Sequence, residues 1–146
     1  MNNSSDQTFG VFYHAMMTAV FVGFADSLFS LIYNILYRAG GIDFPNDLIN
    51  VSYIIFGEMF LFFVIGLIYA GLHSISKRAD FVFIIGFAVL TILIYTGIGS
   101  GHFSIDPAVN LRFQGMLHGL TLIIGVSATA GIPYFYHNET FQHSVI

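Results

Sequence analysis

Asp26, Glu58 and His118 each lie inside a long apolar stretch of the sequence. A charged side chain at the centre of a membrane helix costs roughly 2.5 kcal/mol or more, so ionisable residues are rare there and are candidate functional groups. Carboxyl and imidazole groups can exchange protons or bind a small cation. The competing interpretation is structural, because a buried, protonated Glu58 that hydrogen-bonds to His118 or to a hydroxyl would only hold helices together.

These three residues are expected at similar depths. At 1.5 Å per helical residue, Glu58 lies about 10 Å and His118 about 9 Å from the side that carries the first and third loops. Asp26 lies about 16 Å from that side, roughly one helical turn deeper. We therefore predict Asp26 as a central site and Glu58 with His118 as a relay nearer the loops. Arg112, at the mouth on that side, would tune entry by repulsion or pair with Glu58.

Six histidines in so apolar a chain also suggest a haem. A b-type haem in a bundle needs two facing imidazoles on different helices, with small residues beside them to admit the porphyrin. The predicted helix ends would pair His14 with His73 on one side and His102 with His118 on the other. These four residues are candidate haem or metal ligands, whereas His137 and His143 are expected to be tail residues. The alternative is that histidines at helix ends are ordinary interfacial residues.

Other kinds of chemistry find little support in the sequence. A carboxylate-bridged metal site made from Glu58, His118 and Asp26 lacks the Glu-x-x-His spacing of known bundle sites. The sequence shows no Ser-His-Asp order, no phosphate loop and no cysteine, so thiolate metal sites and disulfides are excluded. We lean against an enzyme and predict no cofactor, with haem b left open.

The composition decides where such residues can lie. Of 146 residues, 56% are hydrophobic and only 8% are charged, whereas soluble domains carry about 25% charged residues. This balance excludes a disordered chain, a nucleic-acid-binding domain and an ordinary cytosolic enzyme. It indicates an integral membrane protein whose first partner is the lipid bilayer.

Four apolar stretches are long enough to cross a bilayer, which takes about 20 helical residues. They cover residues 11–37, 51–72, 81–100 and 113–136. Backbone groups in lipid must be satisfied internally, so each stretch is predicted to be a helix. Short connections favour antiparallel neighbours. The predicted fold is therefore all-α: one four-span domain over residues 1–146, arranged as an up-down four-helix bundle.

Small residues predict where these helices approach one another. The third span carries Gly97 and Gly101, and the fourth carries Gly115, Gly119 and Gly125. Gly97 with Gly101 and Gly115 with Gly119 both form Gly-x-x-x-Gly motifs near the same loop. We expect the third and fourth helices to pack closely through these glycines.

The distribution of Lys and Arg does not decide which side of the membrane each loop faces. One side carries Lys77 and Arg78 and the other Arg38 and Arg112, so the count is two against two. The adjacent pair in a short loop favours cytoplasmic termini. The leading hypothesis is a small membrane protein that handles protons or small cations, as a homo-oligomer or a subunit of a larger membrane complex. The alternatives are an accessory subunit without chemistry and a haem-carrying electron-transfer subunit.

Overall fold

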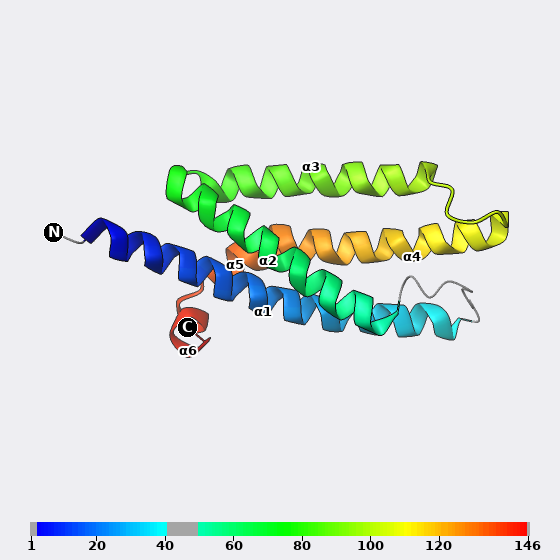
Figure 1. Ribbon diagram of the computed structural model, residues 1–146, viewed down its shortest axis with the longest axis horizontal. Coiled ribbons are helices and arrows are strands. Elements are labelled where there is room, and N and C mark those ends of the chain that lie inside the picture. Colours follow the sequence, from blue (N-terminus) through cyan, green and yellow to red (C-terminus); the bar gives the residue numbers. More distant parts are fainter. Residues whose placement is uncertain (1–2, 41–49, 146) are drawn as a thin grey trace.

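The computed structural model describes residues 3–40 and 50–145, which form helices and the turns between them without a strand (Figure 1). Four long helices dominate: α1 Asn3–Ala39, α2 Val51–Ile75, α3 Ala79–Ser100 and α4 Pro107–Val126. A π-helical turn, η1 Ser127–Gly131, continues α4 into α5 Ile132–His137, and the short α6 Glu139–Val145 follows. The predicted all-α four-helix bundle is confirmed.

Local capping explains where two of the long helices begin. The Asn50 side chain accepts a hydrogen bond from the Tyr53 amide at 2.9 Å and starts α2. Asp106 accepts from the amides of Ala108 and Val109, and Pro107 occupies the first turn of α4. The fourth helix thus begins six residues before the predicted start at 113, because capping residues rather than apolarity set its first turn.

The π-helical turn lies just before Pro133. Proline has no amide hydrogen, and its ring clashes with the carbonyl four residues earlier in a regular helix. The helical turn here contains one extra residue, so the amide of Ile132 donates to the carbonyl of Ser127, five residues back rather than four. Residues 107–137 consequently remain one continuous apolar helical segment long enough to cross a membrane.

The helices α1 and α2 form the closest pair in the bundle. A Cβ added at Gly66 would lie 2.7 Å from Cβ of Ala19, and one added at Gly23 would lie 2.6 Å from Cβ of Phe62. These small residues let the two backbones approach, as is typical of membrane helices. Figure 1 shows α2 crossing from the far end of α1 to the start of α3, so α2 and α3 meet at one end and diverge toward the other.

The predicted glycine contacts differ from those observed. Gly115 and Gly119 of α4 face the rings of Tyr37 and Tyr33 of α1, and the Tyr33 hydroxyl donates to the Gly115 carbonyl at 3.2 Å. Gly97 has no atom within 4 Å of an added Cβ. Large aromatic side chains from α1 therefore fill the space that a glycine–glycine contact with α3 would have used.

Two further glycines from that prediction have other neighbours. A Cβ at Gly101 would meet the ring of Phe103, which belongs to the adjoining loop. Gly125 faces Thr91 of α3. The α3–α4 approach thus uses a glycine near the C-terminal end of α4, away from the loop that joins the two helices.

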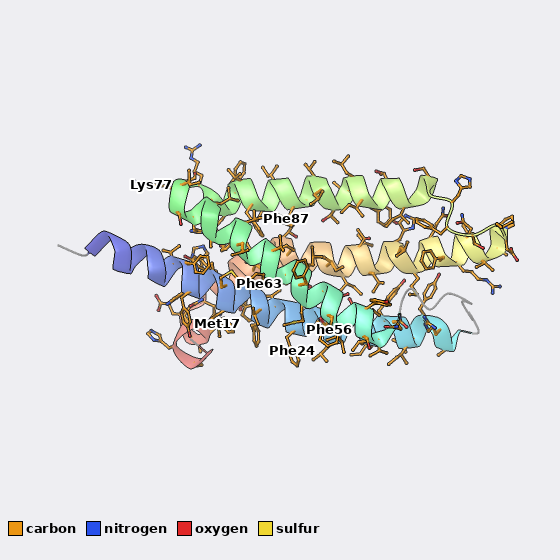
Figure 2. The ribbon with its side chains drawn as sticks, in the orientation of Figure 1. Met17, Phe24, Phe56, Phe63, Lys77 and Phe87 are labelled. Atoms are coloured by element: carbon orange, nitrogen blue, oxygen red, sulfur yellow. The ribbon has the colours of Figure 1, made fainter. Side chains whose placement is uncertain are left out.

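The outer surface of the bundle is apolar. Phe24 and Phe56 are exposed on α1 and α2 (Figure 2), and on α3 only Ala79 and Phe83 are buried. Four segments are long and apolar enough to span a membrane: Gly10–Ala39, Val51–Ile75, Ala79–Ser100 and Pro107–His137. An apolar exterior is what lipid-facing helices require.

Candidate functional site

Asp26 and Glu58 lie together at the interface between α1 and α2. Asp26 is fully buried and Glu58 is 6% exposed, and the two carboxyl groups interact with each other. The same close packing that joins Gly23 to Phe62 and Ala19 to Gly66 brings them level. The predicted offset of one turn is therefore absent, because this antiparallel register, rather than distance from the loops, sets their relative height.

Hydroxyl groups surround the acidic pair. Ser27 and Ser30 of α1 interact with Glu58, and Ser127, the first residue of the π-helical turn, interacts with Asp26. Yet neither carboxyl oxygen of Asp26 has a hydrogen-bond partner of normal geometry among the described residues. A buried polar group without a partner costs roughly 1–3 kcal/mol. Such a group is unusual in a native interior.

A groove reaches Glu58 from outside the α1–α2 interface. It has a volume of about 310 Å³ and runs between α2 and α4, where Gly57 and Glu58 face Leu117, Leu120 and Thr121. The groove exists because α2 diverges from the α3–α4 hairpin along its length (Figure 1). Glu58 is thus the member of the pair that a small species could reach first.

The buried face of α1 extends the polar character beyond the pair. Its polar members recur at helical spacing: Thr18, Asp26, Ser27, Ser30 and Asn34. From Thr18 to Asn34 this face covers roughly 24 Å along the helix, most of the thickness of a bilayer core. Between Thr18 and Asp26 the buried residues carry no polar side chain; they are Ala19, Val22 and Gly23. The polar face is therefore continuous on one side of Asp26 and interrupted on the other.

The structure does not bring His118 to the acidic pair. Its Nε2 lies 2.9 Å from the carbonyl oxygen of Tyr95 on α3, and its ring packs on the Tyr95 ring at 4.2 Å between centroids. The part of α4 that faces Glu58 is lined instead by Leu117, Leu120 and Thr121. The predicted relay from Glu58 to His118 fails geometrically, because the rotation of α4 turns the imidazole toward α3. Arg112 is exposed, away from the buried Glu58.

The four histidines of the haem hypothesis have other surroundings. His73 lies 3.0 Å from Asp80, and its ring packs on Tyr136. His14 lies beside the Tyr13 ring, and His102 is exposed in the loop after α3. His118, as described, contacts Tyr95. Haem binding would require His73 and His118 to give up these contacts, and it stays a prediction.

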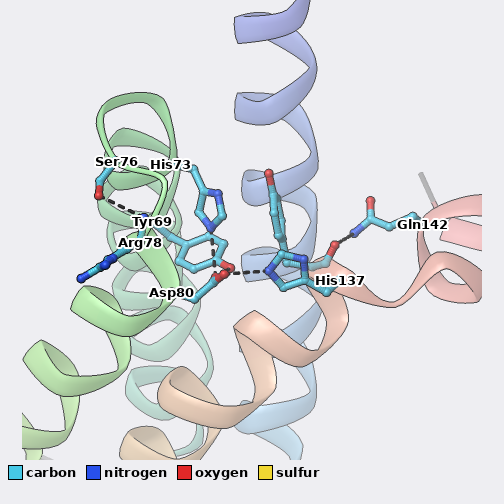
Figure 3. Close-up of polar contacts among 8 residues, drawn as sticks. Tyr69, His73, Ser76, Arg78, Asp80, His137 and Gln142 are labelled. Atoms are coloured by element: carbon cyan, nitrogen blue, oxygen red, sulfur yellow. Dashed lines mark hydrogen bonds and ion pairs between the residues drawn. The ribbon is translucent and has the colours of Figure 1, made fainter.

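A second polar cluster lies where α2, α3 and α5 meet (Figure 3). Asp80 Oδ1 lies 3.0 Å from Nε2 of His73, and Asp80 Oδ2 lies 2.9 Å from Nε2 of His137. The buried Tyr69 donates its hydroxyl hydrogen to Asp80. Imidazole and carboxylate are metal-binding groups. Within the described residues, this trio has the composition and proximity needed to hold an ion.

This cluster was missed from the sequence. The sequence offers His73 as a candidate haem or metal ligand but His137 only as a tail residue, although both close helices that end on the same side of the predicted bundle. Asp80 begins the third helix on that side. An up-down topology places the three helix ends on one side of the membrane, which is the signal in the sequence that could have grouped these residues.

The chain matches no protein-family model, no curated protein sequence and no solved structure. The fold and composition alone therefore define its class. Four apolar helices of spanning length make it a small multi-pass membrane protein.

Proposed function

We propose that this membrane protein passes protons or small cations through the buried Asp26–Glu58 pair. The observation that carries the proposal is the fully buried Asp26 carboxyl, which has no conventional hydrogen-bond partner yet lies against a second acid. Two carboxyl groups so close cannot both stay ionised unless a cation lies between them; otherwise they hold a proton. The pair is thus suited to take up and release a positive species.

The surroundings support a route through the pair. The groove between α2 and α4 gives access to Glu58, and Ser30 and Asn34 continue the buried polar face on one side of Asp26. On the other side Ala19 and Val22 separate Asp26 from Thr18. This apolar stretch is where a gate would lie, since α1 offers no buried polar side chain between Asp26 and Thr18.

Flux through proteoliposomes tests the proposal. Purified protein is reconstituted with a pH-sensitive dye inside, or with Na⁺ or K⁺ gradients, and Asp26→Asn and Glu58→Gln are compared with the wild type. Each substitution keeps the side-chain size but removes proton exchange, so flux should fall to the level of empty liposomes. Glu139→Gln, at an exposed acid of α6, is the matched control and should keep wild-type flux.

A further variant tests whether His118 takes part in the flux, as the sequence predicted. His118→Phe keeps an aromatic ring on Tyr95 and should keep wild-type flux, because His118 faces α3. Equal flux in the wild type, Asp26→Asn and Glu58→Gln would instead favour the accessory role, in which the acids only hold α1 against α2.

We also propose that the chain acts as a homo-oligomer or within a larger membrane complex. The support is the exposure of α3, on which Gly86, Gly97 and Gly99 have open space beside them. Open glycines on a lipid-facing helix allow a second helix to approach closely. The mass of the purified protein in detergent distinguishes a monomer from an assembly.

A further inference from the structure

The trio of His73, Asp80 and His137 draws its members from three helices that are distant in the sequence. His73 lies in the last turn of α2, Asp80 in the first turn of α3, and His137 is the last residue of α5. Figure 3 shows the two imidazoles joined to the same carboxylate. We propose that these three side chains bind a first-row divalent transition metal ion such as Zn²⁺.

The spacing of the ligand atoms fits such an ion. One atom from each of the three side chains lies within 4.8 Å of the others, and the two nitrogens lie 3.0 Å and 2.9 Å from the oxygens of Asp80. Zinc–nitrogen and zinc–oxygen bonds of roughly 2.0–2.1 Å in a tetrahedral site place neighbouring ligand atoms about 3.4 Å apart. Small rotations of the imidazoles are enough to admit the ion.

Neighbouring groups hold the ligands in position. Tyr69, which is buried, donates a hydrogen bond to Asp80, and its ring packs on His73 at 4.6 Å. Tyr136 packs on His73 from another side at 4.7 Å. Metal ligands are commonly oriented by such outer hydrogen bonds. Tyr69 therefore acts as a positioning residue for the carboxylate.

The cluster also has the openness that exchange of an ion requires. The side chain of His137 is 57% exposed and that of Asp80 is 37% exposed, whereas His73 is 17% exposed. Two imidazoles and one carboxylate leave at least one coordination position for water or another ligand. Imidazole donors favour zinc, copper, nickel or iron over magnesium or calcium. The inference does not depend on ion passage through Asp26 and Glu58.

Metal titration of the full chain tests the proposal. The affinity tag is removed, the protein is freed of metal with a chelator, and Zn²⁺ binding is measured by competition with a fluorescent chelator. We expect one Zn²⁺ per chain, and at least about tenfold weaker binding in His73→Gln, Asp80→Asn and His137→Gln. Tyr69→Phe should weaken binding about tenfold through the carboxylate it orients. His102→Gln and His143→Gln, at exposed histidines, should bind like the wild type.

Co²⁺ provides a readout that does not depend on the stability of any variant. In the wild type, Co²⁺ held by the trio should give ligand-field absorption in the visible range, and added Zn²⁺ should abolish it. Absence of that absorption would overturn the proposal and leave the trio as a hydrogen-bonded clamp of three helix ends. Wild-type Zn²⁺ affinity in folded His73→Gln, Asp80→Asn and His137→Gln would overturn it equally.

Discussion

At the scale of single residues, Asp26 is the side chain whose surroundings are least expected. It is buried without a conventional hydrogen-bond partner, although serine hydroxyls and a second acid lie beside it. A side chain kept only to hold helices together would be expected to have its hydrogen bonds satisfied. Residues that serve a function, by contrast, often reduce the free energy of unfolding of the protein.

This contrast predicts the effect of Asp26→Ala on stability. Removing the unpartnered carboxyl relieves a cost of roughly 1–3 kcal/mol, and the small cavity left behind costs about 1 kcal/mol. We expect the variant to be more stable than the wild type by about 1 kcal/mol. Thermal unfolding in detergent, followed by helical circular dichroism, measures it, with Glu139→Ala as the exposed control.

The opposite result would identify a structural role. If Asp26 bonds α1 to α2 as a helix-tying group, Asp26→Ala should unfold at a clearly lower temperature than both the wild type and Glu139→Ala. That outcome would also remove the main support for ion passage, since the acid would then be satisfied in the folded state.

The sequence was informative about Asp26 and Glu58 but not about His118. An acid in an apolar stretch must avoid lipid, so burial of Asp26 and Glu58 against neighbouring helices follows from free energy alone. An imidazole can be buried in more ways, because a single backbone carbonyl can accept its hydrogen bond. His118 found one in Tyr95 of α3, and no spacing in the sequence distinguishes that carbonyl from others.

At the scale of helices, the long segments were predictable and their rotations were not. Bilayer thickness requires about 20 apolar residues, which locates a span to within a turn or so. In a soluble bundle the polar face of each helix would also show which side is buried. On α3 both the buried Phe83 and the exposed Phe81 are apolar, so nothing in its pattern indicates which face meets α4.

Glycines show the same limit, because their partners depend on rotation. Gly115 and Gly119 pack against tyrosine rings of α1 and not against the glycines of α3. Gly66 lies in close contact with Ala19 of α1, although the sequence did not single it out. A Gly-x-x-x-Gly motif indicates that some helix approaches closely. It does not indicate which one.

The α1–α2 contact predicts that alanine substitution at two glycines of α2 changes stability very differently. Gly66→Ala would place a Cβ 2.7 Å from Cβ of Ala19, forcing the helices apart at a cost of about 1–3 kcal/mol. Gly71→Ala on the same helix meets nothing within 4 Å and should leave stability unchanged or raised. Unfolding temperatures of the two variants in the same detergent provide the comparison. Equal temperatures would contradict the close approach of α1 and α2.

At the scale of the whole molecule, the two candidate sites occupy different levels of the bundle. Asp26 and Glu58 lie well inside the long apolar segments. His73, Asp80 and His137 lie at the ends of such segments, on the side of the turn that carries Lys77 and Arg78. Figure 1 shows this turn, the described start of α1 and α6 toward the same end. The trio thus lies at the end of the bundle that carries the described start of α1 and α6, and the acidic pair lies in the interior of the bundle.

This topology makes a prediction that the absence of cysteine renders easy to test. Single cysteines placed at Ser76 and Ser144 should react with a membrane-impermeant maleimide from one side only, and a cysteine at the fully exposed Ile105 only from the other. The expected pattern is all-or-none, because the reagent cannot cross the bilayer. With cytoplasmic termini, intact cells should label Ile105→Cys and spare the other two until the membrane is opened. Residues 107–137 form the one span that separates Ile105 from Ser144. Labelling of Ile105→Cys and Ser144→Cys from the same side would require an even number of crossings between them and would therefore exclude the up-down bundle.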